Sequence, residues 1–171
     1  MIGVVYDPST QVLYHAIDGQ GCYKNLDALT QVEQSSKALK VYADNSFQKH
    51  EQYDEVVKNI ESYAQSEGFN QVEFVYGSGA VINACRVTES QCACYLKLPK
   101  KEEGGGSIWD FAATTCIATE ASAWSSNINC EALDLNRGDS TFMNHEGVLF
   151  ASNKRIAQSL IELISCNKTN D

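Results

Sequence analysis

The chain has 171 residues, of which 43% are hydrophobic and 20% charged, which fits a globular protein of one domain, or one domain plus a fragment. Its 22 acidic and 13 basic residues give a net charge of −9, which disfavours a nucleic-acid polymer as partner. A small anionic ligand stays open, because a metal ion or a helix N-terminus can supply local positive charge. The sequence contains no run of about 18 apolar residues, so it predicts no membrane-spanning helix.

The number of cysteines and the first residues of the chain indicate the cellular compartment. The seven cysteines are an odd number, and the first residues lack the basic start and long apolar core of a secretory signal. Both features predict reduced thiols and a cytoplasmic location. Cys92 and Cys94 do not have the usual spacing of a zinc pair, and on a strand they would share one face. We interpret them as small buried apolar residues.

The first part of the chain predicts strands. Residues 2–6 and 12–17 form an expected hairpin around the turn residues 7–10, and a turn with Gly19 and Gly21 leads the chain toward residues 22–23. The chain begins inside the first of these strands. A domain that began in this way would leave an unpaired edge and an uncovered face, so we expect a missing N-terminal part.

From about residue 39, strands and helices alternate, which is typical of an α/β domain. Strands are expected at 39–43, 72–75, 92–98 and 148–151, and near Leu133 and Leu135. Helices are expected at 50–66, at 80–88, from Ser107 onward, and after a cap formed by Ser152 and Asn153. The last of these helices carries one apolar stripe, made of Ile156, Leu160, Leu163 and Ile164.

Asp110 has two explanations. Ser107 and Asp110 fit a capping box, in which the first and fourth residues satisfy free amides at a helix start. The alternative is a ligand for Mg²⁺, which takes one or two carboxylates together with substrate phosphate. One carboxylate alone cannot make such a site.

Three further segments could meet an anion. Gly77, Ser78 and Gly79 precede a helix and form either a plain turn with a serine cap or a phosphate-binding turn. Lys97 lies at a strand end, where it could point toward an anionic ligand, although most lysines are solvated. Arg137 could reach a phosphate, and a salt bridge within its loop explains it equally well.

In this order, the segments resemble the inositol monophosphatase-like phosphatases, a Mg²⁺-dependent superfamily. The matching segments are residues 3–8, 19–25, 77–81, 109–113 and 117–121. The resemblance implies an α/β fold, a layered αβαβα sandwich of the inositol monophosphatase type that is N-terminally truncated. Residues 1–36 would be remnant hairpin strands of the N-terminal α+β domain, and residues 37–171 the C-terminal α/β domain.

The resemblance also implies roles for individual residues. Asp110 corresponds to a Mg²⁺ ligand, and Gly77, Ser78 and Gly79 correspond to a turn that binds substrate. At the position of Lys97, inositol-specific members carry a glutamate, whereas 3'(2'),5'-bisphosphate nucleotidases carry a basic residue. A lysine can meet a second phosphate and cannot accept a hydrogen bond from a sugar hydroxyl.

The function that this resemblance implies is hydrolysis of the 3'-phosphate of adenosine 3',5'-bisphosphate by metal-activated water. An inositol or sugar phosphate monophosphatase and a non-catalytic remnant or binding module are the alternatives. The partner would be a small phosphorylated molecule, with no membrane involved, and a homodimer stays open.

One departure from the family limits this expectation. The family's Asp-Pro-Ile/Leu-Asp-Gly-Thr motif and its upstream Glu-Glu pair supply most metal ligands, and neither is in this sequence. Asp7 and Pro8 are followed by Ser9 and Thr10 instead. A two-metal mechanism needs bridging carboxylates, so we assign no catalytic residue and expect the chain to be inactive alone.

Overall fold

The computed structural model describes residues 1–32 and 37–165. Its strands are β1 (Ile2–Asp7), β2 (Val12–Ile17), β3 (Gly21–Lys24), β4 (Asp27–Ala28), β5 (Ala38–Tyr42), β6 (Gln71–Val75), β7 (Ala93–Lys97), β8 (Trp124–Ser126) and β9 (Val148–Ala151). Its helices are the 3₁₀ helix η1 (Asn45–Lys49) and the α-helices α1 (Tyr53–Ser66), α2 (Ala80–Val87), α3 (Ile108–Glu120) and α4 (Lys154–Ser165).

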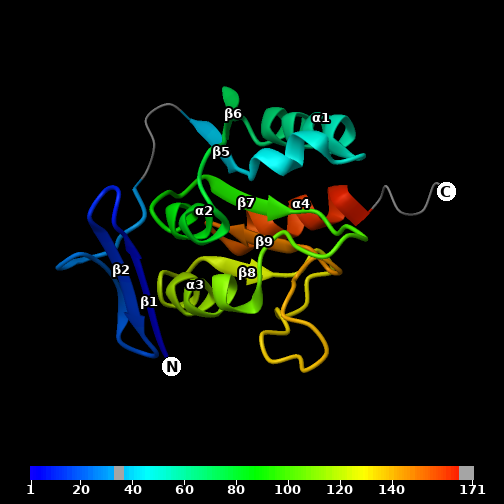
Figure 1. Ribbon diagram of the computed structural model, residues 1–171. Helices are drawn as coiled ribbons and strands as arrows, with labels where there is room; N and C mark the ends of the chain where they lie inside the picture. The colour runs from blue at the N-terminus through cyan, green and yellow to red at the C-terminus, as the bar shows by residue number, and fades with distance from the viewer. Residues whose placement is uncertain (33–36, 166–171) are drawn as a thin grey trace.

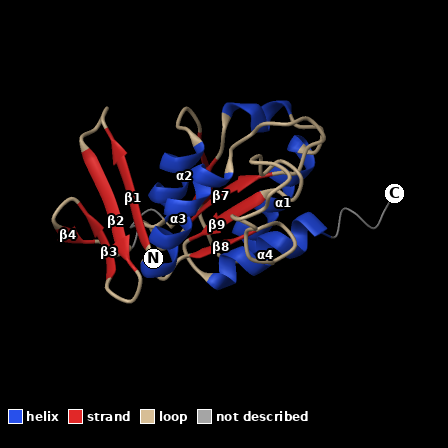
Figure 2. Ribbon diagram, turned by 60° about the horizontal axis from the view of Figure 1, so that its bottom comes forward, coloured by secondary structure: helices blue, strands red, loops and turns tan. Residues whose placement is uncertain are grey.

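These elements form four layers, which alternate between sheet and helices (Figure 1). One outer layer is an antiparallel sheet in the order β1-β2-β3-β4, and the inner sheet is mixed, in the order β6-β5-β7-β9-β8. Figure 2 shows α2 and α3 between the two sheets, with α1 and α4 on the far face of the five-stranded sheet. The α/β sandwich expected from the sequence is therefore confirmed.

The outer sheet packs onto α3 through one face. Along β1, Gly3 and Val5 point inward and are buried, while Val4 and Tyr6 are more than half exposed. A Cβ atom on Gly3 would lie 2.5 Å from the carbonyl oxygen of Ala113 in α3, so only glycine allows this close approach. The outward face of β1 is uncovered by the described residues, as the sequence predicts.

Apolar side chains fill both faces of the five-stranded sheet. On the side of α1 and α4, the core includes Leu39, Val41, Ile60 and Leu160. On the side of α2 and α3, it includes Tyr95, Phe111 and Phe150. A third cluster joins the outer sheet to α2 and α3 through Val5, Tyr14, Cys85 and Ile117. The two sheets are thus connected through the same pair of helices.

Three parallel strands end at one edge of the inner sheet. β5 pairs in parallel with β6 on one side and with β7 on the other. Since their carboxyl ends meet at the same edge, the residues that follow them are brought together. These are Asp44 after β5, Gly77 and Ser78 after β6, and Lys97 at the end of β7.

Two expectations about helix starts need correction. α1 begins at Tyr53 rather than at residue 50, because residues 45–49 form the 3₁₀ helix η1 first. At the start of α4, Asn153 is the cap, since its Oδ1 accepts a hydrogen bond from the Ile156 amide at 3.0 Å. The expected partner cap, Ser152, is buried, and its hydroxyl instead accepts a hydrogen bond from the Ala93 amide at 2.8 Å.

The strands expected near Leu133 and Leu135 do not form. Both residues lie in the long connection between β8 and β9, outside any strand. Leu133 is 9% exposed and joins the core on the side of α2 and α3. Burial of single side chains from a loop therefore produces the alternating apolar pattern that predicts a strand.

The cysteine prediction is partly right. Cys94 is buried, as expected, whereas Cys92 is only half-buried. Cys166 and residues 33–36 lie outside the described residues. No helix in the described parts of the chain is long and apolar enough to cross a membrane. The cytoplasmic location and the division into domains at residues 36 and 37 stay predictions.

Candidate functional site

An open hollow of about 450 Å³ lies at the edge where the parallel strands end. The residues that line it are Asp44, Ser78, Gly79, Ala80, Val81, Ile82, Lys97, Gly105, Gly106 and Asp110. Four of the five site residues predicted from the sequence are therefore together, although they come from three separate segments. The fifth, Gly77, is next to Ser78 in the chain and is not among the described residues that line the hollow.

The turn at Gly77, Ser78 and Gly79 connects β6 to α2. Gly77 has a φ of +98°, a conformation that favours glycine, and this lets the chain reverse its direction. The N-cap of α2 is Gly79, so the expected serine cap is wrong. The Ser78 hydroxyl instead accepts a hydrogen bond from Nη1 of Arg86 at 2.8 Å. The first residues of α2, Ala80, Val81 and Ile82, line the hollow, and free amides at a helix start suit an anion.

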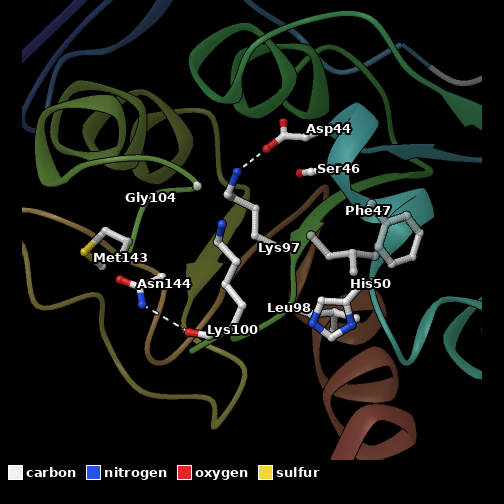
Figure 3. Close-up of a pocket in the computed structure, with 12 residues that line it drawn as sticks. Asp44, Ser46, Phe47, His50, Lys97, Leu98, Lys100, Gly104, Met143 and Asn144 are labelled. Carbon is white, nitrogen blue, oxygen red and sulfur yellow. Dashed lines mark hydrogen bonds and ion pairs between the residues drawn. The ribbon is translucent and has the colours of Figure 1, made fainter. Parts of the chain in front are cut away.

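Lys97 lines the hollow and forms an ion pair with Asp44 (Figure 3). The side chains are 13% and 21% exposed, respectively, so the pair is mostly shielded from water. The other oxygen of Asp44, Oδ1, accepts hydrogen bonds from Tyr95 Oη at 3.4 Å and from Asn83 Nδ2 at 3.3 Å. Burial raises the pKa of Tyr95 well above its usual value, so this hydroxyl stays a donor.

Sequence reasoning missed Asp44. A signal was present, because Asp44 comes two residues after a buried strand, where the carboxyl ends of parallel strands gather polar groups. The parallel pairing of β5 with β7 is what puts Asp44 beside Lys97. That pairing depends on residues far apart in the chain, and the local pattern does not reveal it.

Asp110 lies in the first turn of α3 and forms the expected capping box with Ser107. Its Oδ2 accepts a hydrogen bond from the Ser107 amide at 2.8 Å. This confirms the capping role. A carboxylate has a second oxygen and further lone pairs, so capping leaves acceptor capacity toward the hollow.

Among the described residues, the hollow does not hold the full donor set of a metal site. In the described ranges, 1–32 and 37–165, no group of three or more His, Cys, Asp or Glu side chains is arranged to hold a metal ion. The hollow contains two carboxylates, and Asp44 already pairs with Lys97. Asp110 alone supplies too few oxygen ligands for Mg²⁺, so the described residues do not complete a metal site.

A second slot adjoins the hollow and shares Asp44, Lys97 and Gly105 with it (Figure 3). Its other lining residues are Ser46, Phe47, His50, Leu96, Leu98, Lys100, Gly104, Met143 and Asn144. A Cβ atom on Gly105 would lie 3.3 Å from Cε of Lys100 and 3.5 Å from Cε of Lys97. The glycine-rich loop therefore makes room for two lysine side chains at this edge.

Arg137 lies elsewhere. Its Nη2 forms an ion pair with Asp139 at 2.6 Å, and it is not among the described residues that line the hollow or the slot. The salt-bridge explanation of this arginine is therefore the right one.

Comparison with known proteins identifies the class. Residues 1–169 match the model of the inositol monophosphatase family. The chain therefore belongs to the inositol monophosphatase family, whose members are phosphatases. Comparison with curated protein sequences gives no match.

Solved structures agree with this fold. The inositol monophosphatase from Anabaena (Nostoc) sp. PCC 7120 has 15% identity and a TM-score of 0.66, with 96% of this chain and 58% of that chain covered. Inositol monophosphate-bound SaIMPase-II has 20% identity and a TM-score of 0.69, with 94% and 55% covered. An IMPase/NADP phosphatase complexed with NADP and Ca²⁺ has 17% identity and a TM-score of 0.71, with 98% and 56% covered. The chain thus spans little more than half the length of these proteins.

Proposed function

We propose that the hollow binds a phosphate group of a small phosphorylated molecule, and that the chain is part of a phosphomonoesterase. The proposal rests on one observation: three segments that are separate in the sequence line the same hollow. They are the turn with Ser78, the end of β7 with Lys97, and the start of α3 with Asp110. A hydroxyl, free amides at a helix start and an ammonium group are complementary to a phosphate.

We propose a nucleoside bisphosphate, adenosine 3',5'-bisphosphate, as the ligand. The side chains of Lys97 and Lys100 both lie beside Gly105 and line the slot, so that a ligand with two phosphates would have a cation for each. One structural neighbour is complexed with NADP, itself a nucleotide with several phosphates.

An inositol or sugar phosphate is the second candidate. The Asp44 carboxylate in the hollow can accept hydrogen bonds from hydroxyl groups, which lysine cannot do. Another structural neighbour is bound to inositol monophosphate. The two candidates differ in which member of the Asp44–Lys97 pair faces the ligand.

We propose that Asp110 contributes one carboxylate to Mg²⁺ binding. Because the described residues do not complete a metal site, we derive no hydrolytic step from them. In Asp110→Asn, the amide oxygen can still cap the Ser107 amide, so the free energy of unfolding should fall by less than about 1 kcal/mol. Mg²⁺-dependent enhancement of ligand binding should be lost. Unchanged enhancement would contradict the assignment of Asp110.

The ligand is tested by calorimetric titration of the purified chain, with Mg²⁺ present, against adenosine 3',5'-bisphosphate and inositol 1-phosphate. We expect tighter binding of the bisphosphate, and in Lys97→Met a loss of affinity of about tenfold for the bisphosphate only. Lys101→Met is the matched control, since Lys101 is exposed and lines neither the hollow nor the slot. An equal loss for both ligands in Lys97→Met would contradict the preference for a bisphosphate.

A parallel measurement of phosphate release separates an enzyme from a binding module. Binding without release is what the incomplete donor set predicts for this chain alone. Robust Mg²⁺-dependent release would overturn that prediction.

A further inference from the structure

Arg86 reaches the phosphate-binding turn from the other end of α2. Arg86 is in the last turn of this helix, yet its Nη1 lies 2.8 Å from Oγ of Ser78, eight residues earlier. Long side chains on a helix extend toward its N-terminus, which explains how the arginine spans this distance. Ser78 is in turn part of the hollow's lining.

The positions along the helix support this contact. Ile82 and Arg86 are four residues apart in α2 and share one face of the helix, and Ser78 lies in the turn directly before the N-cap, Gly79. Ile82 lines the hollow together with Ser78, and it also lines a second depression, between the outer sheet and α2, together with Arg86. The arginine stem thus passes from this second depression toward the hollow.

The neighbours of Arg86 leave its charge available to the turn. Glu89, which shares the second depression, is already bound by the Lys24 ammonium at 2.6 Å and by the Tyr14 hydroxyl. Asp7, also in this depression, accepts hydrogen bonds from Ser9 and Thr10. In the part of the chain that the structure describes, Arg86 forms no ion pair.

The contact fixes the direction of the serine proton. Arginine only donates hydrogen bonds, so Ser78 Oγ must be the acceptor in this contact. A hydroxyl has one proton and two acceptor sites. With one acceptor site taken by Arg86, the Ser78 proton is directed to another acceptor, and the nearby cation also makes the hydroxyl a stronger donor.

We propose that Arg86 is a positioning residue, which orients the Ser78 hydroxyl as a hydrogen-bond donor to a phosphate oxygen in the hollow. The inference rests on the proposed function, because it assumes a phosphate as the ligand. It adds a residue that does not line the hollow itself.

A double-mutant cycle tests the proposal, with adenosine 3',5'-bisphosphate as the probe. Arg86→Met keeps the apolar stem and removes the donors, and it should weaken binding about 5- to 10-fold, the size of one typical hydrogen bond. Arg86→Lys should recover part of the loss. In a Ser78→Ala background, Arg86→Met should cause no further loss, because the arginine acts through the serine. Arg155→Met is the matched control, since Arg155 is an exposed arginine paired with Glu67.

The contact itself is tested without ligand. The rotation of the Arg86 guanidinium group, followed by NMR, should be slow in the wild type and faster in Ser78→Ala. Equal rotation in both proteins would overturn the inference whatever the chain binds. Additive losses in the cycle would overturn it while leaving the proposed function intact. Failure of the wild type to bind the bisphosphate or inorganic phosphate would overturn the proposed function and, with it, this inference.

Discussion

The ion pair between Lys97 and Asp44 gives the sharpest prediction on stability. Lys97→Met keeps the length and apolar stem of the side chain and leaves the Asp44 carboxylate without its cation. Breaking a fully buried pair costs about 3–5 kcal/mol, and an exposed pair contributes at most about 1 kcal/mol. With 13% and 21% of the two side chains exposed, we expect a loss of about 2 kcal/mol in the free energy of unfolding. For a chain of this length, this corresponds to a drop in Tm of about 4–8 °C.

Urea unfolding followed by circular dichroism measures this loss, and the double variant Asp44→Asn/Lys97→Met is its control. Removing both charges leaves no unpaired ion, so the double variant should be more stable than Lys97→Met alone. The reasoning is refuted if Lys97→Met unfolds at the wild-type urea concentration, or if the losses of the two single variants simply add.

Two further predictions concern the junction between the outer sheet and α3. Gly3→Ala should lower the free energy of unfolding by about 1–3 kcal/mol, because its Cβ would lie 2.5 Å from a backbone oxygen of α3; a urea midpoint equal to that of the wild type would contradict the close packing. The carboxylate of Glu120 accepts hydrogen bonds from the Gly19 and Gly21 amides at 2.9 and 2.8 Å, which lowers its pKa below the usual 4.5. A lowered pKa in the folded state stabilises the fold above pH 4.5, and this stabilisation is lost as the pH falls through the folded-state value. The stability of Glu120→Gln should therefore depend less on pH in this acid range, and parallel pH profiles for the two proteins would argue against these bonds.

Local patterns in the sequence predict the parts of the fold that local chemistry determines. The hairpin of β1 and β2 follows from an apolar run, the turn residues that begin with Asp7 and Pro8, and a returning strand, and the start of α3 follows from the capping box of Ser107 and Asp110. Both features depend on residues within a few positions of each other.

Features that depend on distant contacts were not predictable in this way. Leu133 and Leu135 alternate as in a strand, yet no strand pairs with them in the described residues, and Leu133 is buried from a loop. Asp44 joins the site only because β5 and β7 are parallel neighbours. Arg86 contacts Ser78 across the whole length of α2, and in the sequence it is one helical arginine among several charged residues.

The central claim is that Ser78 and Lys97 bind a phosphate group in the hollow at the ends of the parallel strands. The most direct test is a crystal structure of the chain soaked with adenosine 3',5'-bisphosphate and Mg²⁺. We predict a phosphate within hydrogen-bond distance of both the Ser78 hydroxyl and the Lys97 ammonium. A well-ordered ligand bound elsewhere on the molecule, with Lys97 still paired only with Asp44, would contradict this account.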